Sequence, residues 1–258
     1  MITIAIANQK GGVGKTTTAI NIATAMAATG WKTLLIDLDP QGNASTGLGI
    51  ASSERRYSSY DLLVEGSSVA DCLQGTSIPG LDIIPATQDL SGAEVELVSV
   101  NDRAARLNAA LDDHAQHEIC FIDCPPSLGL LTLNALTAAD TLLVPLQCEF
   151  FALEGLSQLL QTVEQVQQRF NARLGIIGIA LTMFDRRNRL TDQVADDVRD
   201  CLGELVFKSV IPRNVRLSEA PSHGLPALVY DHGCAGSRAY MALASELIAR
   251  LPEKRKAA

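Results

Sequence analysis

The sequence predicts an α/β fold in which a mostly parallel, twisted sheet is flanked by helices on both faces. Short apolar runs alternate with longer amphipathic segments along the 258 residues, as in successive βαβ units. Hydrophobic residues make up 47% and aromatic residues only 4%, a composition typical of parallel strands buried on both faces. Because we find no internal repeat or linker, we expect a single domain over residues 1–251, followed by a short basic tail over 252–258.

The strands are predicted from the apolar runs. The first run ends at a glycine-rich loop, and the fourth and fifth are bounded by Asp and Pro residues. The predicted strands are Ile2–Ala7, Thr33–Ile36, Leu81–Pro85, Ile119–Ile122, Thr141–Pro145, Ile176–Leu181 and Phe207–Ile211.

The helices are predicted from apolar residues that recur at helical spacing. The first helix, Lys15–Thr29, is stopped by Gly30, and a long helix after the fifth strand places five apolar side chains on one face. The segment 43–80 is Ser- and Gly-rich, and we expect one short helix in it. The five apolar positions of the long helix are Leu153, Leu156, Leu160, Val163 and Val166, and the other predicted helices are Tyr60–Val64, Asp102–Asp113, Thr191–Leu202 and Ala239–Arg250.

Composition narrows the classes of function. The net charge of −8 argues against strong binding of nucleic acid by the whole surface, although a local basic patch could still neutralise phosphates. Six scattered cysteines without a C-x-x-C pair predict buried free thiols in a reducing cytoplasm. No apolar stretch reaches the roughly 18 residues of a membrane span and the N-terminus lacks a signal peptide, so we expect a cytoplasmic protein with no stable membrane anchor.

The loop after the first strand has the composition of a phosphate-binding loop. A strand, a glycine-rich loop and a helix follow one another, which predicts a single-domain P-loop NTPase. Glycines let the backbone approach phosphate, and successive N–H groups with the helix dipole attract anions. Gln9 occupies the first glycine position of the usual pattern, and an extra lysine, Lys10, precedes the glycines. The nucleotide-binding residues predicted in this loop are Lys10, Gly11, Gly12, Val13, Gly14, Lys15, Thr16 and Thr17.

Three of these side chains have distinct expected roles towards bound ATP and Mg²⁺. Lys15 bridges the β- and γ-phosphates, the Thr16 hydroxyl ligates Mg²⁺, and Thr17 reaches the α-phosphate.

Aspartates at strand ends complete the expected site. Asp123 ends a buried strand, where a carboxylate can serve Mg²⁺ or orient water, and Asp39 is the better candidate to orient the attacking water. Asp37 either serves Mg²⁺ or caps its loop, and each aspartate could instead be a helix cap or turn residue. We therefore predict metal binding by Thr16, Asp39 and Asp123.

Four motifs in chain order resemble those of the ParA/MinD group of ATPases. Lys10-Gly-Gly-Val-Gly-Lys-Thr-Thr17 resembles the deviant Walker A loop, and Asp37-Leu-Asp-Pro-Gln-Gly-Asn43 and Asp123-Cys-Pro-Pro-Ser127 resemble the two switch segments. Ile211-Pro-Arg-Asn-Val-Arg-Leu-Ser-Glu-Ala-Pro-Ser222 resembles a segment of chromosomal, Soj-type ParA proteins. The resemblance runs from the first strand to about Tyr240.

The resemblance implies a homodimer with two ATP molecules at its interface. Lys10 would reach the phosphates of the partner subunit, and Lys10, Lys15 and Asp39 would be the catalytic residues. By the same resemblance, Pro212 and Asn214 would lie near adenine, with Met183 a weaker candidate.

The resemblance also implies binding to double-stranded DNA without sequence preference, and ATP hydrolysis stimulated by a ParB-type partner, in a cycle that segregates chromosome origins on the nucleoid. Arginines follow two strands that can end at one sheet edge, and arginine suits phosphate contacts, although a solvated face would look similar. The predicted DNA-binding residues are Arg187, Arg189, Arg213 and Arg216.

A protein with this phosphate loop could have a function other than chromosome partitioning. A MinD-type membrane ATPase needs a lipid-facing C-terminal helix, whereas Leu247, Ile248 and Leu251 fit packing on the domain. A nitrogenase iron-protein type needs shared cysteines, for which Cys124 and Cys148 are the available pair. A metabolic synthetase needs a substrate pocket that the sequence does not reveal. A related ATPase that positions a plasmid, a protein cluster or a membrane-bound division system would use the same chemistry.

Overall fold

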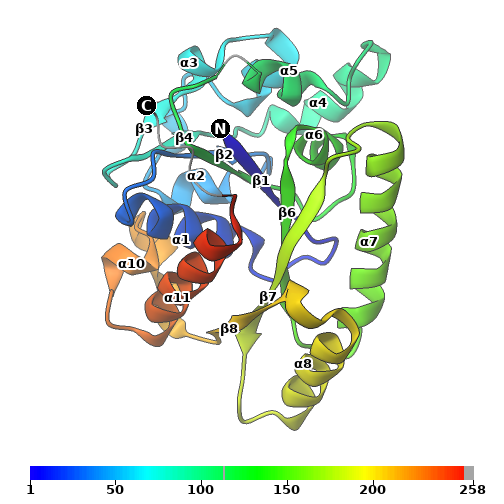
Figure 1. Cartoon of the computed structure of the whole chain (residues 1–258). Helices are drawn as coiled ribbons and strands as arrows, with labels where there is room; N and C mark the ends of the chain where they lie inside the picture. The colour runs from blue at the N-terminus through cyan, green and yellow to red at the C-terminus, as the bar shows by residue number, and fades with distance from the viewer. Residues whose placement is uncertain (113, 253–258) are drawn as a thin grey trace.

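The computed structural model describes residues 1–112 and 114–252, which form an eight-stranded sheet with helices on both faces (Figure 1). The strand order is β3-β4-β2-β5-β1-β6-β7-β8, and all neighbours run parallel except β3, which pairs antiparallel with β4 at one edge. The strands are β1 (Ile2–Ile6), β2 (Thr33–Asp37), β3 (Gln74–Gly75), β4 (Leu81–Ile84), β5 (Ile119–Asp123), β6 (Thr141–Gln147), β7 (Gly175–Phe184) and β8 (Val206–Pro212).

The helices divide between the two faces of the sheet. Helices α1, α2 and α9–α11 cover one face and α4–α8 the other, as the opposed positions of α1 and α11 against α7 show in Figure 1. They are α1 (Lys15–Ala28), α2 (Asn43–Gly47), α3 (Val69–Cys72), α4 (Leu90–Glu96), α5 (Arg106–Leu111), α6 (Leu130–Ala138), α7 (Ala152–Arg169), α8 (Arg189–Leu202), α9 (Val215–Glu219), α10 (Ala227–Tyr230) and α11 (Ala235–Arg250).

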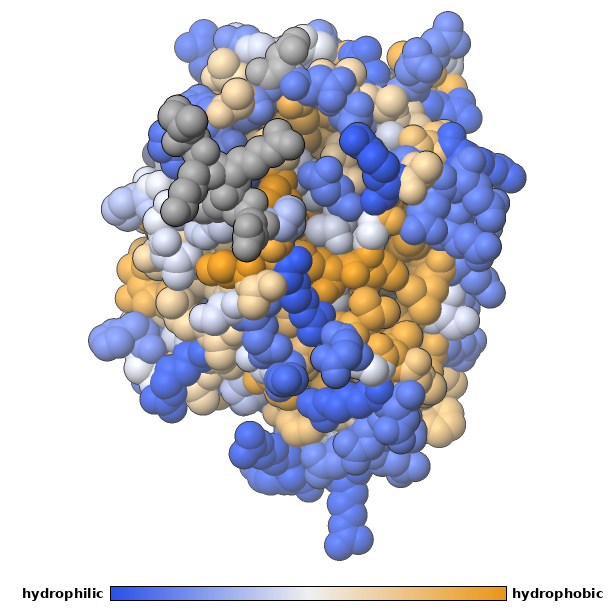
Figure 2. Space-filling model, viewed as in Figure 1, coloured by the Kyte–Doolittle hydropathy of each residue, from blue (hydrophilic) through white to orange (hydrophobic). Residues whose placement is uncertain are grey.

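The central strand β1 shows why the sheet is buried on both sides. Its alternate side chains enter different cores: Ile4 and Ile6 pack with α1 and α11, whereas Ala5 packs with the helices of the other face. Successive residues of a strand point to opposite faces, so a continuous apolar run is what two covered faces require. On the face seen in Figure 2, hydrophobic residues gather between β6 and α7, and hydrophilic residues surround them, including those over α8.

The predicted α/β class and all seven predicted strands are confirmed, each within a few residues of its expected bounds. The helices α2, α3, α4, α6, α9 and α10 and the edge strand β3 were not predicted, because most are too short to show a period. The predicted domain boundary at residue 251 stays a prediction, and residues 253–258 of the expected tail lie outside the described residues.

Three helix predictions need correction. The helix expected from Asp102 begins at Arg106, because Asp102 has a left-handed φ of 57° that a helix does not accept. In α7, Leu153 is exposed and Leu159 is buried in its place. The last helix begins at Ala235 rather than Ala239, since the sulfur of Cys234 accepts a hydrogen bond from the Ser237 amide at the start of α11.

The helices α1 and α11 are joined by one buried polar contact. The hydroxyls of Thr18 and Tyr240 lie 3.1 Å apart, and both side chains are buried. Burial raises the pKa of Tyr240 well above its usual range, so this phenol stays neutral. The contact satisfies two hydroxyls that water cannot reach.

Removing one hydroxyl of this pair should destabilise the fold. Tyr240→Phe leaves the Thr18 hydroxyl without its partner, and we expect the free energy of unfolding to fall by about 1 kcal/mol. Urea denaturation followed by circular dichroism measures this, with Tyr57→Phe at an exposed position as the matched control. The double variant Thr18→Val/Tyr240→Phe should cost less than the sum of the two single changes. Additive losses would show that the two hydroxyls do not interact.

Candidate functional site

The candidate site lies where the three central strands β1, β2 and β5 end. Ile6 and Asp37 are both register partners of Asp123, so the ends of all three strands meet at the same level of the sheet. The chain leaves β1 towards β2 on one side and leaves β5 towards β6 on the other. Ligands of open α/β sheets bind at such a reversal of strand order, beyond the carboxyl ends of the strands.

The loop between β1 and α1 is shaped by two glycines and by ties to neighbouring strands. Gly12 and Gly14 have left-handed φ values of 78° and 85°. The Asn8 side chain donates to the carbonyl of Pro145 at 2.8 Å and accepts from the Lys10 amide at 3.0 Å. The Thr182 hydroxyl donates to the carbonyl of Val13 at 2.8 Å. Neighbouring strands therefore hold the loop in place at the start of α1.

Lys15 is an almost buried cation at the first position of α1. Its side chain curls back so that Nζ donates to the carbonyl of Lys10 at 3.0 Å. Burial lowers the pKa of Lys15, and the carboxylates of Asp123 and Asp39 act in the opposite direction. A buried ammonium group is costly unless it finds anions, so this site favours a negatively charged ligand.

Asp123 is the least satisfied polar side chain of the site. It is fully buried, and neither carboxylate oxygen makes a hydrogen bond of normal geometry within residues 1–112 and 114–252. Burial, together with the neighbouring Asp37, raises its pKa well above the usual range, while the nearby Thr16 hydroxyl and Lys15 oppose the shift. Buried carboxylates are paired or bind metals. The unpartnered oxygens beside Thr16 therefore fit a hard cation such as Mg²⁺.

Asp37 and Asp39 differ in how their carboxylates are used. Asp37 accepts hydrogen bonds from the Asp39 amide, the Ser45 amide and the Ser45 hydroxyl at 3.2, 2.9 and 2.7 Å. Burial raises the pKa of Asp37 to about 6. These contacts favour the capping interpretation of Asp37. Asp39 keeps one oxygen without a protein donor among the described residues, because only the Gln41 amide, at 3.0 Å, bonds to the other.

A pocket joins the loop to these side chains and fits a triphosphate with its cation. Its walls combine the glycine-rich loop, one ammonium group, hydroxyls and the Asp39 carboxylate, a donor and acceptor set that suits MgATP. The lining residues are Gly11, Gly12, Gly14, Lys15, Thr16, Thr17, Asp39, Gln41, Asn43, Pro126 and Met183.

A second pocket continues from the first along the far side of the loop. Met183, Pro212 and Asn214, which were predicted to lie near a base, share this pocket with Gly14 and Thr17. Ile211, Leu217 and the Tyr240 ring add apolar surface to its walls, which suits a planar base. The other lining residues are Thr182, Arg213 and Ser218.

Lys10 points away from the pocket within the single chain. Its ammonium forms an ion pair with Glu149, which follows β6, and both side chains are about half exposed. An exposed ion pair contributes about 0.2–1 kcal/mol, so Lys10 can exchange Glu149 for another anion.

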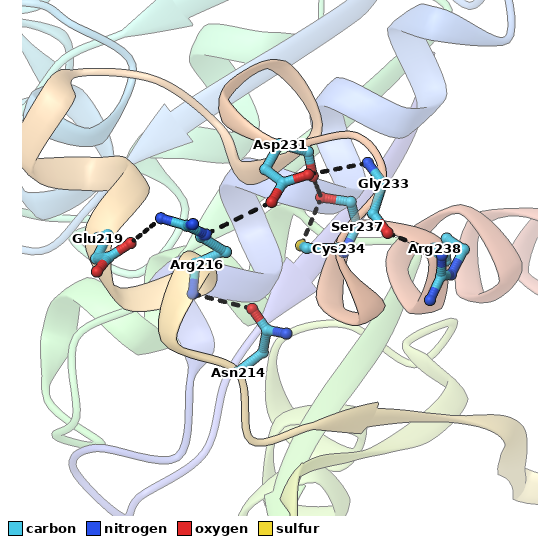
Figure 3. Close-up of polar contacts among 8 residues, drawn as sticks. All are labelled: Asn214, Arg216, Glu219, Asp231, Gly233, Cys234, Ser237 and Arg238. Atoms are coloured by element: carbon cyan, nitrogen blue, oxygen red, sulfur yellow. Dashed lines mark hydrogen bonds and ion pairs between the residues drawn. The ribbon is translucent and has the colours of Figure 1, made fainter.

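The four arginines predicted to bind DNA are placed near the ends of β7 and β8. Arg187 forms two hydrogen bonds with Asp185 and lowers the pKa of that carboxylate to about 2. Arg189 begins α8, and Arg213 lines the base pocket. Arg216 on α9 is held between Glu219 and Asp231 (Figure 3).

The sequence analysis missed several residues that shape the site. Asn8 and Thr182 tie down the loop, Ser45 satisfies Asp37, and Glu149 holds Lys10. Each comes from a different part of the chain, so spacing along the sequence gave no sign of them. Only Asn8, directly before the loop, carried a local signal, since Asn favours turns.

The alternative uses of this fold find little support in the geometry. Cys124 and Cys148 are buried with raised pKa values, that of Cys148 to about 11, so neither presents a thiolate at the surface. The prediction of buried cysteines is confirmed for four of the six, but Cys201 is exposed and Cys234 is only partly buried. Leu247 is buried against α1 and β1 rather than facing outwards. Within the described part of the chain, helices with the length and apolarity to span a membrane are absent.

Comparison with known proteins gives a consistent result. A family model described as AAA domain matches residues 1–176. The chain is 58% identical to the chromosome partitioning protein ParA of Caulobacter vibrioides, over 96% of this chain and 94% of that protein. It is 52% identical to the sporulation initiation inhibitor protein Soj of Bacillus subtilis, over 95% and 98%.

Solved structures agree on the fold. Cobyrinic acid a,c-diamide synthase from Mycobacterium smegmatis, solved with ADP and magnesium, is 37% identical with a TM-score of 0.82, over 95% of this chain and 93% of that one. An ATP complex of McdA from Cyanothece has a TM-score of 0.86 over 96% of each chain, at 23% identity, and supports the fold alone.

The raised pKa of Asp123 predicts a pH-dependent stability. The folded protein holds this proton more tightly than the unfolded chain, so stability is lost as pH rises from the ordinary carboxyl pKa through the raised one. Asp123→Asn should therefore raise the melting temperature of the nucleotide-free protein at about pH 8 and reduce its decline between about pH 5 and pH 8. Differential scanning calorimetry measures both. A lower melting temperature for Asp123→Asn at about pH 8 would contradict this interpretation of the buried carboxylate.

Proposed function

The chain belongs to the AAA-domain family and, within it, to the ParA/Soj chromosome-partitioning ATPases, and on this premise we propose that it segregates chromosome origins through a cycle of ATP binding, DNA binding and hydrolysis. It is an ATP hydrolase whose cofactors are ATP and Mg²⁺. In the proposed cycle an ATP-bound homodimer binds double-stranded DNA without sequence preference. A ParB-type partner then stimulates hydrolysis, and the protein releases the DNA. The observation that carries the proposal is the unpartnered carboxylate of Asp123 beside Thr16 and Lys15.

The residues of the pocket have different proposed roles in ATP hydrolysis. Lys15 leaves the Lys10 carbonyl and binds the terminal phosphates, while the loop amides bind the remaining phosphate oxygens. Asp39, which lines the pocket, orients the attacking water. Thr16, Asp39 and Asp123 would hold Mg²⁺, which when bound neutralises negative charge on the phosphate oxygens.

Lys10 connects hydrolysis to dimerisation. Neither Lys10 nor its ion-pair partner Glu149 lines the pocket, and the half-exposed ammonium can exchange this carboxylate for the phosphates of a partner subunit. Two chains related by a twofold axis would each supply Lys10 to the other, and ATP would then lie between them. This role of Lys10 is the proposed reason for the extra lysine in the loop.

The proposed DNA-binding surface lies beyond the ends of β7 and β8. Through it the protein would associate with the nucleoid in the cytoplasm. Arg187, Arg189, Arg213 and Arg216 follow the ends of these two neighbouring strands. A dimer doubles this set, which favours phosphate binding despite the overall charge of −8.

Two other functions remain to be distinguished by experiment. The same cycle could position a plasmid or a protein cluster, in which case only the partner differs. The likeness to a cobyrinic acid a,c-diamide synthase favours an ATP-dependent amide-forming enzyme as the second candidate. ATP hydrolysis that rises with DNA and a ParB-type protein favours partitioning, whereas consumption of ATP only with a carboxylic acid substrate and an amine donor favours amide formation.

The role of Asp39 can be tested by its removal. Asp39→Ala should still bind ATP and form the ATP-dependent dimer, because the loop and Lys15 are intact. Its hydrolysis rate should fall by roughly 100-fold or more, as expected for a lost water-orienting group. Phosphate release and sedimentation velocity measure the two effects, with Asp112→Ala at the opposite end of the sheet as the control. An unchanged rate would remove Asp39 from catalysis.

The DNA-binding step predicts a response to both nucleotide and salt. The protein should bind duplex DNA of mixed sequence with ATP and not with ADP, and binding should weaken as salt increases. For Arg187→Ala we expect the slope of log affinity against log salt to be shallower by about 0.9 for each arginine lost. Arg173→Ala, at the opposite end of the sheet, is the matched control. Equal binding with ATP and ADP would contradict the proposed switch.

A further inference from the structure

Arg216 is held by carboxylates on two sides (Figure 3). Its Nη1 donates to Glu219 at 2.8 Å, and its Nε lies 3.5 Å from Asp231. The guanidinium also lies 5.9 Å from the ring centre of Tyr230. Half of the side chain is exposed, so a phosphate could approach it, but the two carboxylates already supply more negative charge than the arginine can neutralise.

The two carboxylates are attached to the fold in different ways. Glu219 and Arg216 both belong to α9 and are one turn apart, so they move together. Asp231 belongs to the loop before α11: its Oδ1 accepts the Gly233 amide at 3.1 Å, and its carbonyl accepts the Ser237 hydroxyl at 2.8 Å. Figure 3 shows these contacts on the side of Asp231 away from Arg216. A shift of α9 therefore changes the distance from Arg216 to Asp231 and leaves the contact with Glu219 intact.

The same short helix forms part of the base pocket. Leu217 and Ser218 of α9 line this pocket with Gly14 and Thr17 of the phosphate loop. A base bound in the pocket would contact α9 at residues directly beside Arg216. Nucleotide binding and the Arg216–Asp231 contact are thus connected through five residues of one helix.

A second arginine at this edge is held in a similar way. Arg187 donates to both oxygens of Asp185 at 2.9 Å, although most of its side chain is exposed. In the described part of the chain, Arg238 differs because its Nη1 donates to the carbonyl of Gly233 rather than to a carboxylate. Two of the four proposed phosphate-contacting arginines, Arg187 and Arg216, are therefore paired with carboxylates.

We infer that Glu219 and Asp231 compete with DNA phosphates for Arg216. Of the two contacts, the one between Arg216 and Asp231 depends on whether a nucleotide occupies the base pocket. The inference rests on the DNA binding of the proposed function. Each exposed pair shifts an equilibrium by about twofold to fivefold, so the competition weakens binding without blocking it. The carboxylates keep the affinity of the nucleotide-free chain low, and movement of α9 by a bound nucleotide frees Arg216 from Asp231.

Fluorescence anisotropy with a labelled duplex of mixed sequence tests the inference, without nucleotide and with a non-hydrolysable ATP analogue. Asp231→Asn should raise the affinity of the nucleotide-free protein by about twofold to fivefold and reduce the ratio between the two states. Glu219→Gln should raise both affinities by a similar factor and leave the ratio unchanged. Both gains should disappear when Arg216→Ala is combined with either variant.

Glu204→Gln is the matched control, since it removes one exposed negative charge on the surface away from Arg216. Gains no larger than those of Glu204→Gln, or gains that persist with Arg216→Ala, would overturn the inference and leave the proposed function intact. Absence of DNA binding by the unmodified protein with the ATP analogue would overturn the DNA-binding step and this inference together. If Asp231→Asn fails to fold by circular dichroism, Asp231→Ala provides the same comparison.

Discussion

The site depends on one costly arrangement, the burial of Asp123 with both carboxylate oxygens unpartnered within the described residues. A carboxylate at this position cannot reach water, and its neighbours Asp37 and Asp39 add negative charge. Without a ligand, burial favours the protonated form of this carboxyl group, which raises its pKa. The fold tolerates this cost because the surrounding strands β1, β2 and β5 are paired along their whole length. The burial of Asp123 lowers the stability of the fold at the strand ends, and in return it provides a group that can bind a cation.

The phosphate loop places a second buried charged group, Lys15, beside Asp123. Lys15 is buried near Asp123, and the Lys10 carbonyl and the nearby carboxylates stabilise its charge. A triphosphate with its cation would provide both groups with a partner of opposite charge. Its anionic oxygens would bind the Lys15 ammonium group, and the cation would bind the Asp123 carboxylate. The loop is held for this purpose by Asn8 and Thr182 from neighbouring strand ends. The order of strands in the sheet therefore determines the chemistry at its edge.

Much of this could be predicted from the sequence, because the relevant signals are local. The apolar runs gave the strands, and the glycines with Lys15 and Thr16 gave the loop. The partners of these residues could not be predicted, since Glu149 is distant in sequence from Lys10, and spacing does not show which residues contact Asp37 and Arg216. Short elements such as α9 escaped for a different reason: five residues are too few to show a helical period, and packing against α11 stabilises them. The pairing of Arg216 with two carboxylates thus depends on the tertiary structure, and the pattern of charges along the sequence does not reveal it.

The surface arginines illustrate why composition is a weak guide to partners. The protein is acidic overall, yet arginines gather where β7 and β8 end, and two of them, Arg187 and Arg216, are paired with carboxylates.

The polar strand ends have the groups needed to bind ATP together with a cation. Isothermal titration of ATP into the protein, with Mg²⁺ and then with a chelator, tests this most directly. We expect tight binding with Mg²⁺ and a large loss of affinity without it. Equal affinity under both conditions would contradict it, because Asp123 would then have no cation to bind.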